Sequence, residues 1–510
     1  MKNTSKRLLA LLLTALMVSP MTACSEQTQT ETDAPETSAQ TTPAAEAEET
    51  ETEPAETEET REPSGAPDTN WDGREWIAYG AKHNTYPQYS NMEIDADEIT
   101  GETLNDAVFN RNAALEARYN IVISQDVSTE DVHATLPALV LSGDAKYHLS
   151  FVETGSVGRL ALNGNFLEMT SLPYIDYTKD WWNLHVNEQI SIANKLYFTS
   201  SDFSLMDKNR ISVMFYNKGL LTDLQLPDPV DMVREGTWTV DVMKEWVETA
   251  GQDVDGDGEL DDTDRFGLGM DSYNAFLTFV VGAGGLSIEK AEGDIPQIVE
   301  NSEPLIDAVN AVFDLTCTTQ NSYFCNDFNG KVSYSIWSVL ANSFRAGNTL
   351  FASGFTHTLR GFSDSEIDYN VIPYPKLNEA QEKYYNLAEY QTMLFAIPTT
   401  CPDLDFAAFV LEALSYESTN TTLYTYYDIN CKRKYTYDET GAEMLDLIFS
   451  SAVYDLNVIY NWAGINDVLT STIPQSRNNT FSSAFASRKK GAKKSIEKTV
   501  KDYTTEETAE

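Results

Sequence analysis

The sequence predicts an α/β fold built as two lobes, and three observations support this. Apolar segments of strand length alternate with segments of helical periodicity between residues 76 and 162. The same alternation returns between residues 212 and 503. About 440 residues follow Asn70, which is more than one hydrophobic core usually holds. We therefore expect two sheets covered by helices rather than one large sheet.

The first alternation begins with a short strand and a helix whose apolar residues recur at near-helical spacing after Thr103, the expected N-cap. The strands are expected at Trp76–Tyr79, Ile121–Ser124 and Leu149–Val152. The helices are expected at Leu104–Tyr119, His133–Leu141 and Val157–Leu162. Strands that alternate with helices favour a parallel or mixed sheet.

The second alternation is longer, and it contains no repeat of fixed period. Its strands are expected at Ser212–Tyr216, Phe266–Gly269, Tyr369–Ile372 and Leu394–Ile397. Its helices are expected at Thr239–Gln252, Pro304–Thr316, Asp403–Ser415, Glu443–Phe449 and Ala484–Tyr503.

The N-terminal residues predict export. A basic start precedes the apolar run Leu8–Val18, which is too short to span a bilayer, so residues 1–23 are expected to be a signal peptide. Met21–Cys24 (MTAC) resembles a bacterial lipobox, in which Cys24 would carry the lipid, although Leu is usual where Met21 stands. The alternative is an ordinary signal peptide followed by a stray cysteine. The resemblance implies an extracytoplasmic protein, lipid-anchored to the bacterial cell membrane.

Residues 24–70 are expected to form a disordered acidic tether, because Glu, Thr, Ala, Pro, Ser and Gln dominate them and offer nothing to bury. The formal net charge of the chain is −44. Such acidity disfavours nucleic acid and anionic lipid surfaces as partners, which leaves the lipid anchor as the only expected membrane contact.

The cysteines give no sign of a zinc site, because they form no CxxC pair and no histidine cluster accompanies them. Cys317 and Cys325 are close enough in sequence for a disulfide outside the cell. Buried free thiols are the alternative.

The sharpest local motif is an acidic loop, Asp253–Asp264, with the spacing of an EF-hand calcium loop. Alternate carboxylates in such a loop wrap a hard cation, and Gly258 supplies the turn at position 6. Asp at position 12 departs from the usual Glu. A structural Ca²⁺ is therefore a possible cofactor, with a solvated acidic loop as the alternative. The candidate ligands are Asp253, Asp255, Asp257, Glu259 through its backbone carbonyl, Asp261 and Asp264.

Motifs for catalysis are missing from the sequence. The five histidines form no H-x-x-x-H arrangement, and neither a G-x-S-x-G elbow nor a P-loop occurs. We therefore expect a protein without enzymatic activity. Carboxylates are plentiful, so a glycosidase that uses two acids stays open as an alternative.

Eight short segments resemble family 1 extracellular solute-binding proteins, the carbohydrate-type binding components of ABC importers. Their order and spacing carry the resemblance, which runs from about residue 75 to about residue 503. The segments are Gly101–Asp106 (GETLND), Leu167–Ile175 (LEMTSLPYI), Trp181–Asn183 (WWN), Lys195–Phe198 (KLYF), Phe215–Lys218 (FYNK), Glu235–Trp238 (EGTW), Asp368–Lys376 (DYNVIPYPK) and Phe395–Pro398 (FAIP).

This resemblance implies a two-lobed, hinged fold of the periplasmic-binding-protein type (type II). By analogy, the chain crosses between lobes near Asp202–Ser212 and around Tyr390–Phe395. Residues 71–205 and 391–440 are expected to form lobe 1, and residues 206–390 and 441–510 lobe 2. A solute that bridges both lobes would shift the population to a closed form that a permease can distinguish.

The expected ligand is a sugar, which needs aromatic platforms and hydrogen-bonding groups. Trp181 and Trp182 lie in an irregular polar segment, and Trp462 lies in a late, loop-like segment where the family often places a stacking aromatic. Glu153 and Asp202 are the polar candidates, with packing or solvation as the alternative for all five. Trp238 and Trp246 are expected in the core.

The sequence thus predicts a monomeric binding protein that captures a carbohydrate, an oligosaccharide by preference, and delivers it to ABC permease subunits. The alternatives are a surface-anchored two-carboxylate glycoside hydrolase and a sensory or adhesion lipoprotein of the same fold.

Overall fold

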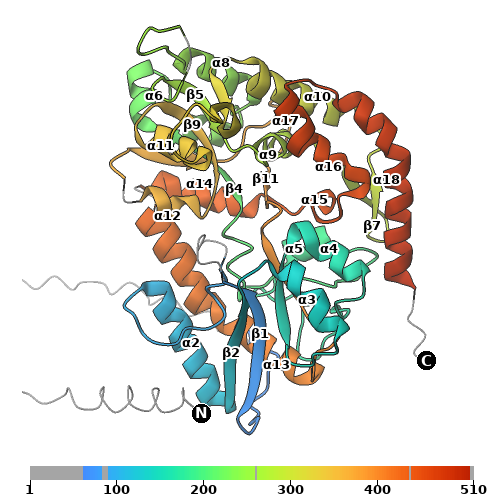
Figure 1. The fold of residues 1–510 in the computed structure, drawn as a ribbon. Coiled ribbons are helices and arrows are strands. Elements are labelled where there is room, and N and C mark those ends of the chain that lie inside the picture. The colour runs from blue at the N-terminus through green and yellow to red at the C-terminus, as the bar shows by residue number, and fades with distance from the viewer. Residues whose placement is uncertain (1–60, 83–89, 259–260, 364, 436–437, 506–510) are drawn as a thin grey trace, which may run out of the picture. The chain divides into compact units, whose positions relative to one another are not determined.

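Two β-sheets organise the part of the chain that the computed structural model describes, residues 61–82, 90–258, 261–363, 365–435 and 438–505. The first sheet has four strands in the order β12-β3-β1-β2, and the second has five in the order β10-β4-β9-β5-β8. Figure 1 shows both sheets with their helices. The predicted signal peptide and Cys24 lie outside the described residues.

The first sheet combines three parallel strands with one antiparallel strand that the chain adds much later. Its strands are β1 (Arg74–Ala81), β2 (Ile121–Ser128), β3 (Leu149–Glu153) and β12 (Met393–Ala396). β1 pairs in parallel with β2 and with β3, while β12 runs antiparallel to β3. Every residue of β3 is buried, as expected for a strand that is covered on both faces.

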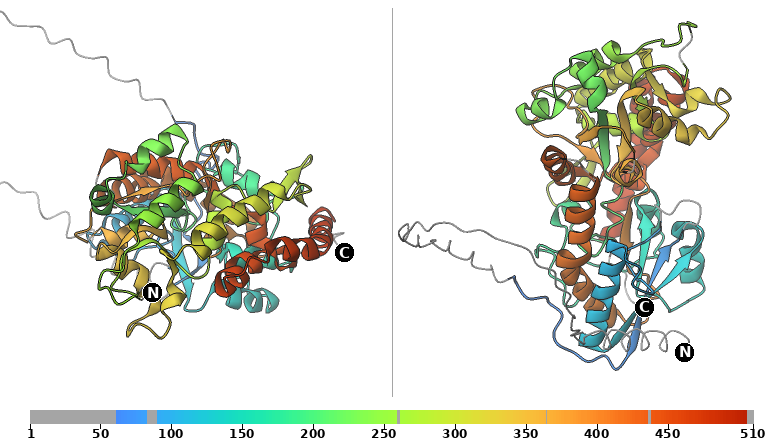
Figure 2. Two further views of the ribbon diagram at one scale, coloured as in Figure 1. Left: turned by 90° about the horizontal axis from the view of Figure 1, so that it is seen from above. Right: turned by 90° about the vertical axis from the view of Figure 1, so that its left-hand side faces the viewer.

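Helices pack on both sides of this sheet, and Figure 2 shows α2 beside α13. They are α2 (Thr103–Tyr119), α3 (Val132–Leu141), α4 (Thr154–Leu162), α5 (Leu184–Ile190) and α13 (Leu404–Ser418), which π-helical segments at Thr419–Leu423 and Thr425–Tyr435 continue. The expected N-cap of α2 was one residue late. Thr103 is the first helical residue, and the Glu102 carboxylate caps the helix by accepting the Asn105 N–H at 2.8 Å.

The second sheet is also mixed, with β5 parallel to β8 and β9, and β4 antiparallel to β9 and β10. Its strands are β4 (Ser212–Asn217), β5 (Phe266–Met270), β8 (Ser322–Phe324), β9 (Thr349–Phe355) and β10 (Tyr369–Ile372). The helices that follow these strands are α6 (Lys218–Leu224), α7 (Pro229–Glu235), α8 (Val240–Ala250), α9 (Ala275–Gly282), α10 (Glu303–Phe313), α11 (Val339–Arg345) and α12 (Thr358–Phe362).

Smaller elements complete the fold. A hairpin pairs β6 (Ile288–Ala291) with β7 (Ile295–Ile298), and β11 (Asn386–Leu387) pairs with β13 (Ala452–Val453). The C-terminal helices are α14 (Glu439–Ser450), α15 (Leu456–Tyr460), α16 (Ile465–Asp467), α17 (Ile473–Ser476) and α18 (Phe481–Thr504). Helix α15 packs on α4 of the first sheet, whereas α14 packs on β10 of the second.

Two of the segments along which the chain passes between the sheets run side by side. The first leads into β4, and the second leads from β11 into β12. Ile211 and Ala388 form an antiparallel bridge, and the Arg210 carbonyl accepts the Glu389 N–H at 3.3 Å. Both segments lie where the family resemblance places them, near Asp202–Ser212 and Tyr390–Phe395. The exact lobe boundaries stay predictions.

The predicted tether is too long at its C-terminal end, because residues 62–70 already belong to the folded unit that begins at Glu62. The buried Glu412 carboxylate accepts the Ser64 hydroxyl at 3.2 Å and the Gly65 N–H at 2.9 Å. A side chain at Gly65 would collide with the Tyr174 carbonyl. The composition of these residues is typical of a polar linker, but the distant Glu412 carboxylate accepts hydrogen bonds from them and fixes their position.

The core contains Trp238 and Trp246, as predicted, at 0% and 5% exposure. Cys317, Cys325, Cys401 and Cys431 are all free thiols, which is the second of the two alternatives for Cys317 and Cys325.

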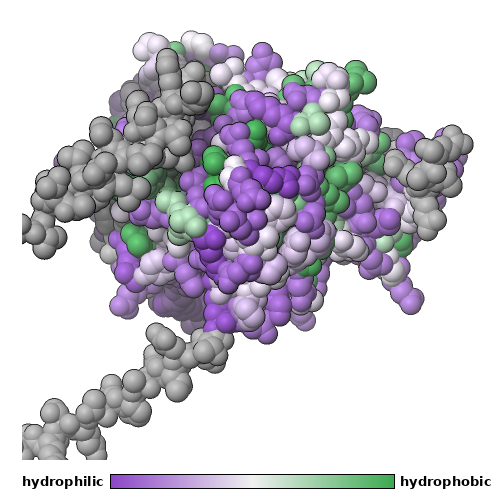
Figure 3. Space-filling view, turned by 90° about the horizontal axis from the view of Figure 1, so that it is seen from below, coloured by the Kyte–Doolittle hydropathy of each residue, from purple (hydrophilic) through white to green (hydrophobic). Residues whose placement is uncertain are grey.

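Figure 3 shows one face of the surface, which is mostly hydrophilic with scattered apolar residues. None of the helices in the described ranges combines the length and the apolar character that a membrane crossing requires.

Candidate ligand-binding site

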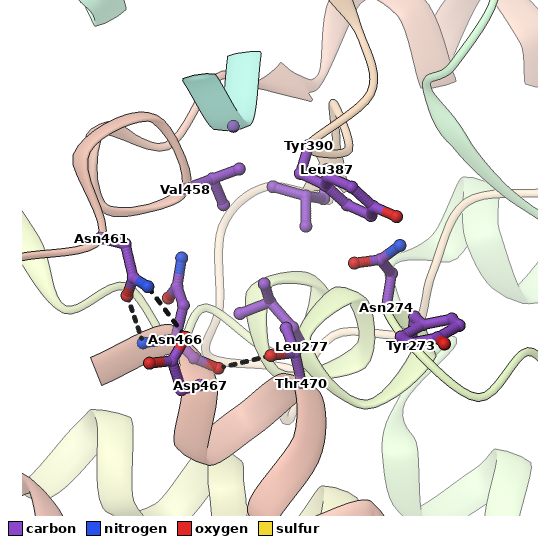
Figure 4. Close-up of a pocket in the computed structure, with 11 residues that line it drawn as sticks. Tyr273, Asn274, Leu277, Leu387, Tyr390, Val458, Asn461, Asn466, Asp467 and Thr470 are labelled. Carbon is purple, nitrogen blue, oxygen red and sulfur yellow. Dashed lines mark hydrogen bonds between the residues drawn. The ribbon is translucent and has the colours of Figure 1, made fainter. Parts of the chain in front are cut away.

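A cavity of about 250 Å³ lies beside the paired segments, where residues from both halves of the fold meet. Figure 4 shows it. Helix α4 of the first sheet contributes Gly155, and the loop after β5 of the second sheet contributes Tyr273 and Asn274. The other lining residues are Leu277, Leu387, Tyr390, Val458, Asn461, Asn466, Asp467 and Thr470. The cavity is therefore assembled from four stretches of chain that are far apart in sequence.

Tyr390 is held in the cavity by the start of α4. The Gly155 N–H donates to the Tyr390 carbonyl at 2.8 Å, and the Thr154 hydroxyl donates to the Glu389 carbonyl at 2.8 Å. A Cβ on Gly155 would lie 3.2 Å from the Tyr390 Cβ and 3.3 Å from its ring. Glycine thus lets the phenol lie directly against the helix backbone. Tyr390 is 40% exposed.

Tyr273 supplies a second aromatic surface in the cavity lining. Tyr273 is 52% exposed and stacks nearly parallel on Trp337, which is 50% exposed, with the ring centroids 5.3 Å apart. Large exposed aromatics are unusual on a hydrophilic surface, and here they lie at and beside one cavity. Flat, exposed rings are the surfaces on which the C–H faces of a sugar stack.

The polar side of the cavity is a network that the turn between α15 and α16 holds in place. Asn461 adopts a left-handed conformation with φ of 42°, and its amide donates to the Asp467 carboxylate at 2.8 Å. Its oxygen accepts the Asn466 N–H at 3.2 Å, and the Thr470 hydroxyl donates to the Asn466 carbonyl at 3.0 Å. Groups fixed in this way meet a ligand without losing side-chain freedom on binding.

The tryptophans predicted to bind sugar are buried. Trp181 and Trp182 are 2% and 1% exposed, and both indole N–H groups donate to the Glu412 carboxylate, at 3.1 Å and 2.8 Å. Trp462 is 4% exposed, donates to the Thr499 hydroxyl at 3.1 Å and stacks on Tyr460. None of these three rings lines the cavity or presents a free face in this structure, so their role in binding stays a prediction.

The two predicted polar residues also contact protein groups. Glu153 accepts from His133 Nδ1 at 3.0 Å, and this hydrogen bond raises the pKa of His133. Asp202 accepts the Thr419 hydroxyl at 2.7 Å. Neither lines the cavity, although Glu153 stands two residues before Gly155. Their role as ligand contacts also stays a prediction.

Tyr273, Asn274 and Tyr390 were not among the residues predicted from the sequence. Tyr390 is the residue at which the family resemblance places a crossing, so its position could have drawn attention to it. Tyr273 and Asn274 follow the short strand Phe266–Met270, and loops after the strands of an α/β sheet commonly carry ligand contacts.

The acidic loop brings together part of the predicted calcium ligands. Asp253, Asp255 and Asp257 each place a carboxylate oxygen within 4.8 Å of the others. Gly258 has φ of 85°, as the sharp turn requires. The buried Asp264 carboxylate instead accepts the Val254 and Asp261 N–H groups, at 2.7 Å and 2.9 Å.

Asp261 and Glu259 are the remaining two predicted ligands. The Asp261 carboxylate accepts the backbone N–H and the hydroxyl of Thr263, at 2.9 Å and 2.8 Å. Glu259 lies outside the described residues. The three converging carboxylates fit a hard cation, while Asp264 and Asp261 hold the shape of the loop.

Comparison with known proteins finds similarity at the level of structure. No family model matches the sequence, and no curated protein matches it. An ABC substrate-binding protein from Listeria monocytogenes, Lmo0181, in complex with cycloalternan, superposes with a TM-score of 0.53 at 14% identity, covering 84% of this chain and all of that one. An ABC transporter solute-binding protein from Thermotoga lettingae, bound with α-D-tagatose, gives a TM-score of 0.50 at 14% identity, with the same two coverages.

These likenesses span the described part of the chain almost completely and establish its fold. The predicted α/β fold of the periplasmic-binding-protein type is confirmed.

A buried acid next to the cavity makes stability depend on pH. Asp455 caps α15 by accepting the Asn457 N–H at 2.8 Å, and burial raises its pKa to about 6. The folded state therefore binds this proton more tightly than the unfolded chain. The resulting stabilisation is complete below about pH 4 and is lost as the pH rises through 6.

We expect Asp455→Asn to raise the free energy of unfolding at pH 7.5 by about 3 kcal/mol at most, since asparagine caps a helix as well and stays neutral. The gain should disappear at pH 4. Urea unfolding of both proteins at the two pH values measures it. Asp438→Asn is the control of opposite sign: although burial opposes ionisation there, hydrogen bonds from Thr440, Gly441 and Lys218 lower the pKa of Asp438 to about 2. An equal gain at both pH values would contradict the assignment.

Proposed function

We propose that this chain is the extracytoplasmic solute-binding component of an ABC importer. It captures a carbohydrate as a monomer and delivers it to permease subunits without catalysis. One observation carries the proposal: a cavity between the two halves of a binding-protein fold presents exposed aromatic rings opposite fixed amide and carboxylate groups. Proteins of the same fold have been crystallised with cycloalternan and with α-D-tagatose.

The cavity suits capture because its walls belong to segments that contact different sheets. Gly155 opens a helix of the first sheet, whereas Tyr273 and Asn274 follow a strand of the second. A sugar that touches both walls gains its full set of contacts only when the halves are close together. Binding would therefore favour a closed form, which a permease could recognise.

The lining disfavours the glycosidase alternative. A glycosidase needs two carboxyl groups about 5 to 9.5 Å apart on either side of the scissile bond. Within the described part of the chain, Asp467 is the one lining residue that carries a carboxylate, and Asn461 already donates to it. The polar lining is thus suited to hydrogen-bonding hydroxyl groups rather than to acid–base chemistry.

The test is a thermal-shift screen of the mature chain against glucose, galactose, tagatose, maltose, maltotriose, cellobiose and cycloalternan. At least one sugar should raise the melting temperature by mass action. Tyr390→Ala should weaken the binding of that sugar about tenfold or more in calorimetry, because the ring supplies an exposed stacking face. Tyr424→Ala is the matched control, since Tyr424 is 41% exposed but lies outside the cavity lining. A screen without any shift, or turnover of a glycan, would overturn the proposal.

We also propose that a lipid on Cys24 holds the protein on the outer face of the cell membrane, as its sequence context suggests. Cys24→Ala should move the protein from the membrane fraction to the medium while sugar affinity stays unchanged. Fractionation followed by immunoblotting measures this, with Cys317→Ala as the control that should stay in the membrane fraction. Retention of the Cys24 variant in the membrane would rule out the anchor.

The acidic loop is proposed to hold a structural Ca²⁺ through Asp253, Asp255 and Asp257, with Glu259, Asp261 and Asp264 completing the predicted ligand set. The ion would offset the repulsion between three carboxylates that lie within 4.8 Å of one another. Millimolar Ca²⁺ should raise the melting temperature of chelator-treated protein, and Asp255→Asn/Asp257→Asn should abolish that rise. Sugar affinity, measured in parallel, separates a structural role from a role in binding. A melting temperature that calcium leaves unchanged would exclude the site.

A further inference from the structure

A buried ion pair joins the two segments that pass between the sheets. Arg210 precedes β4, Glu389 follows β11, and the guanidinium Nη1 donates to the Glu389 Oε1. The two side chains are 2% and 1% exposed, so the pair is shielded from water. Each partner belongs to a different segment, which makes the pair a link across the region where the fold would bend.

The second oxygen of this carboxylate reaches the candidate ligand cavity. Glu389 Oε2 accepts from the Asn274 side-chain amide at 3.3 Å, and Asn274, 8% exposed, lines the cavity. Glu389 therefore contacts Arg210 with one oxygen and a cavity residue with the other.

This contact fixes which way the Asn274 amide faces. Burial raises the pKa of Glu389, and the Arg210 guanidinium opposes this shift. Paired with Arg210, the ionised carboxylate can only accept hydrogen bonds, so the amide turns its NH₂ group toward Glu389. Its carbonyl oxygen is then the atom left for the cavity, and Figure 4 shows that oxygen directed toward the other lining residues. The backbone of Asn274 is fixed as well, because its N–H donates to the Asp271 carboxylate at 2.9 Å. The cavity thus presents a hydrogen-bond acceptor at this point.

We propose that Glu389, clamped by Arg210, is a positioning residue that sets the Asn274 oxygen as an acceptor for a sugar hydroxyl and couples this contact to the paired crossing segments. The inference rests on the proposed function and deepens it, because it assigns one specificity-determining contact. The ligand group at this point is a hydroxyl that donates a hydrogen bond.

The geometry leads to a non-additivity test. If Glu389 acts on the ligand only through Asn274, then removing either one removes the same hydrogen bond. Arg210→Met/Glu389→Leu removes both charges of the pair together, which a folded core tolerates better than the loss of one partner. The probe is the sugar of the panel above that raises the wild-type melting temperature most.

We expect Asn274→Ala to weaken the binding of this sugar about tenfold, the effect of one hydrogen bond. The Arg210→Met/Glu389→Leu variant should lose a similar factor. The triple variant should also lose about tenfold rather than about a hundredfold. Calorimetry gives the affinities, and circular dichroism establishes that each variant is folded at the assay temperature.

Glu389→Gln is the second variant, for the case that the pair replacement does not fold. Its new amide keeps the shape of the carboxylate, and Arg210 will hold its oxygen. The new NH₂ group then faces Asn274 and turns that amide around, so sugar affinity should fall, and Asn274→Ala should add nothing to the fall. Glu412→Gln is the matched control. Glu412 is equally buried at 1% exposure and serves the indoles of Trp181 and Trp182, so its variant should keep wild-type affinity.

The outcomes are distinct. Additive losses near a hundredfold, unchanged affinity in the pair variants, or an equal loss in Glu412→Gln would overturn the inference while sugar binding by the wild type stands. A wild type that binds none of the sugars would overturn the proposed function, and the positioning role with it.

Discussion

The pairing of the two crossing segments is the constraint on which the rest of this structure depends. One segment continues directly into β4 of the second sheet, and the other into β12 of the first. The bridge between Ile211 and Ala388 sets their register, and the Arg210 carbonyl accepts from both Glu389 and Thr392. A shift of one residue here would displace a strand in each sheet, because both strands begin within a few residues of the bridge.

The ion pair between Arg210 and Glu389 makes that register specific rather than merely favourable. Two charges removed from water are costly, and their attraction offsets part of that cost only when they lie close together in a favourable geometry. Arg210 and Glu389 meet that condition only when the two segments lie as they do, so a slipped register would leave both charges buried and unmatched. The same carboxylate reaches Asn274, which connects the register to the cavity wall.

Much of the fold could be predicted from the sequence, since its strands and long helices carry strong patterns. The predicted strand Leu149–Val152 and helix Thr239–Gln252 correspond to β3 and α8 within two residues at each end. Helix α9 escaped prediction because all eight of its residues are buried, so it has no polar face and no helical period. Helices α15 and α16 are too short for any period to be visible. Part of the cavity lining comes from these three helices, and Tyr273, Asn274, Tyr390 and Asn461 come from connecting stretches, which is why its residues could not be located in advance.

The tryptophans show why residue type alone does not tell an exposed ring from a buried one. Trp181 and Trp182 stand in a polar, irregular segment, but Glu412, from a helix more than 200 residues later, accepts both indole N–H groups and draws the rings into the core. No local pattern records such a partner.

A ring that stacks on a sugar must keep one face open in the free protein, so exposure distinguishes a platform from a core residue better than residue type does. Tyr390, Tyr273 and Trp337 meet that criterion, because each is at least 40% exposed. Each ring also packs against a neighbour: the backbone at Gly155 supports Tyr390, while Tyr273 and Trp337 support each other. Rings supported in this way lose little freedom when a ligand binds. The smaller entropic cost of binding offsets the free-energy cost of exposing their apolar area in the free protein.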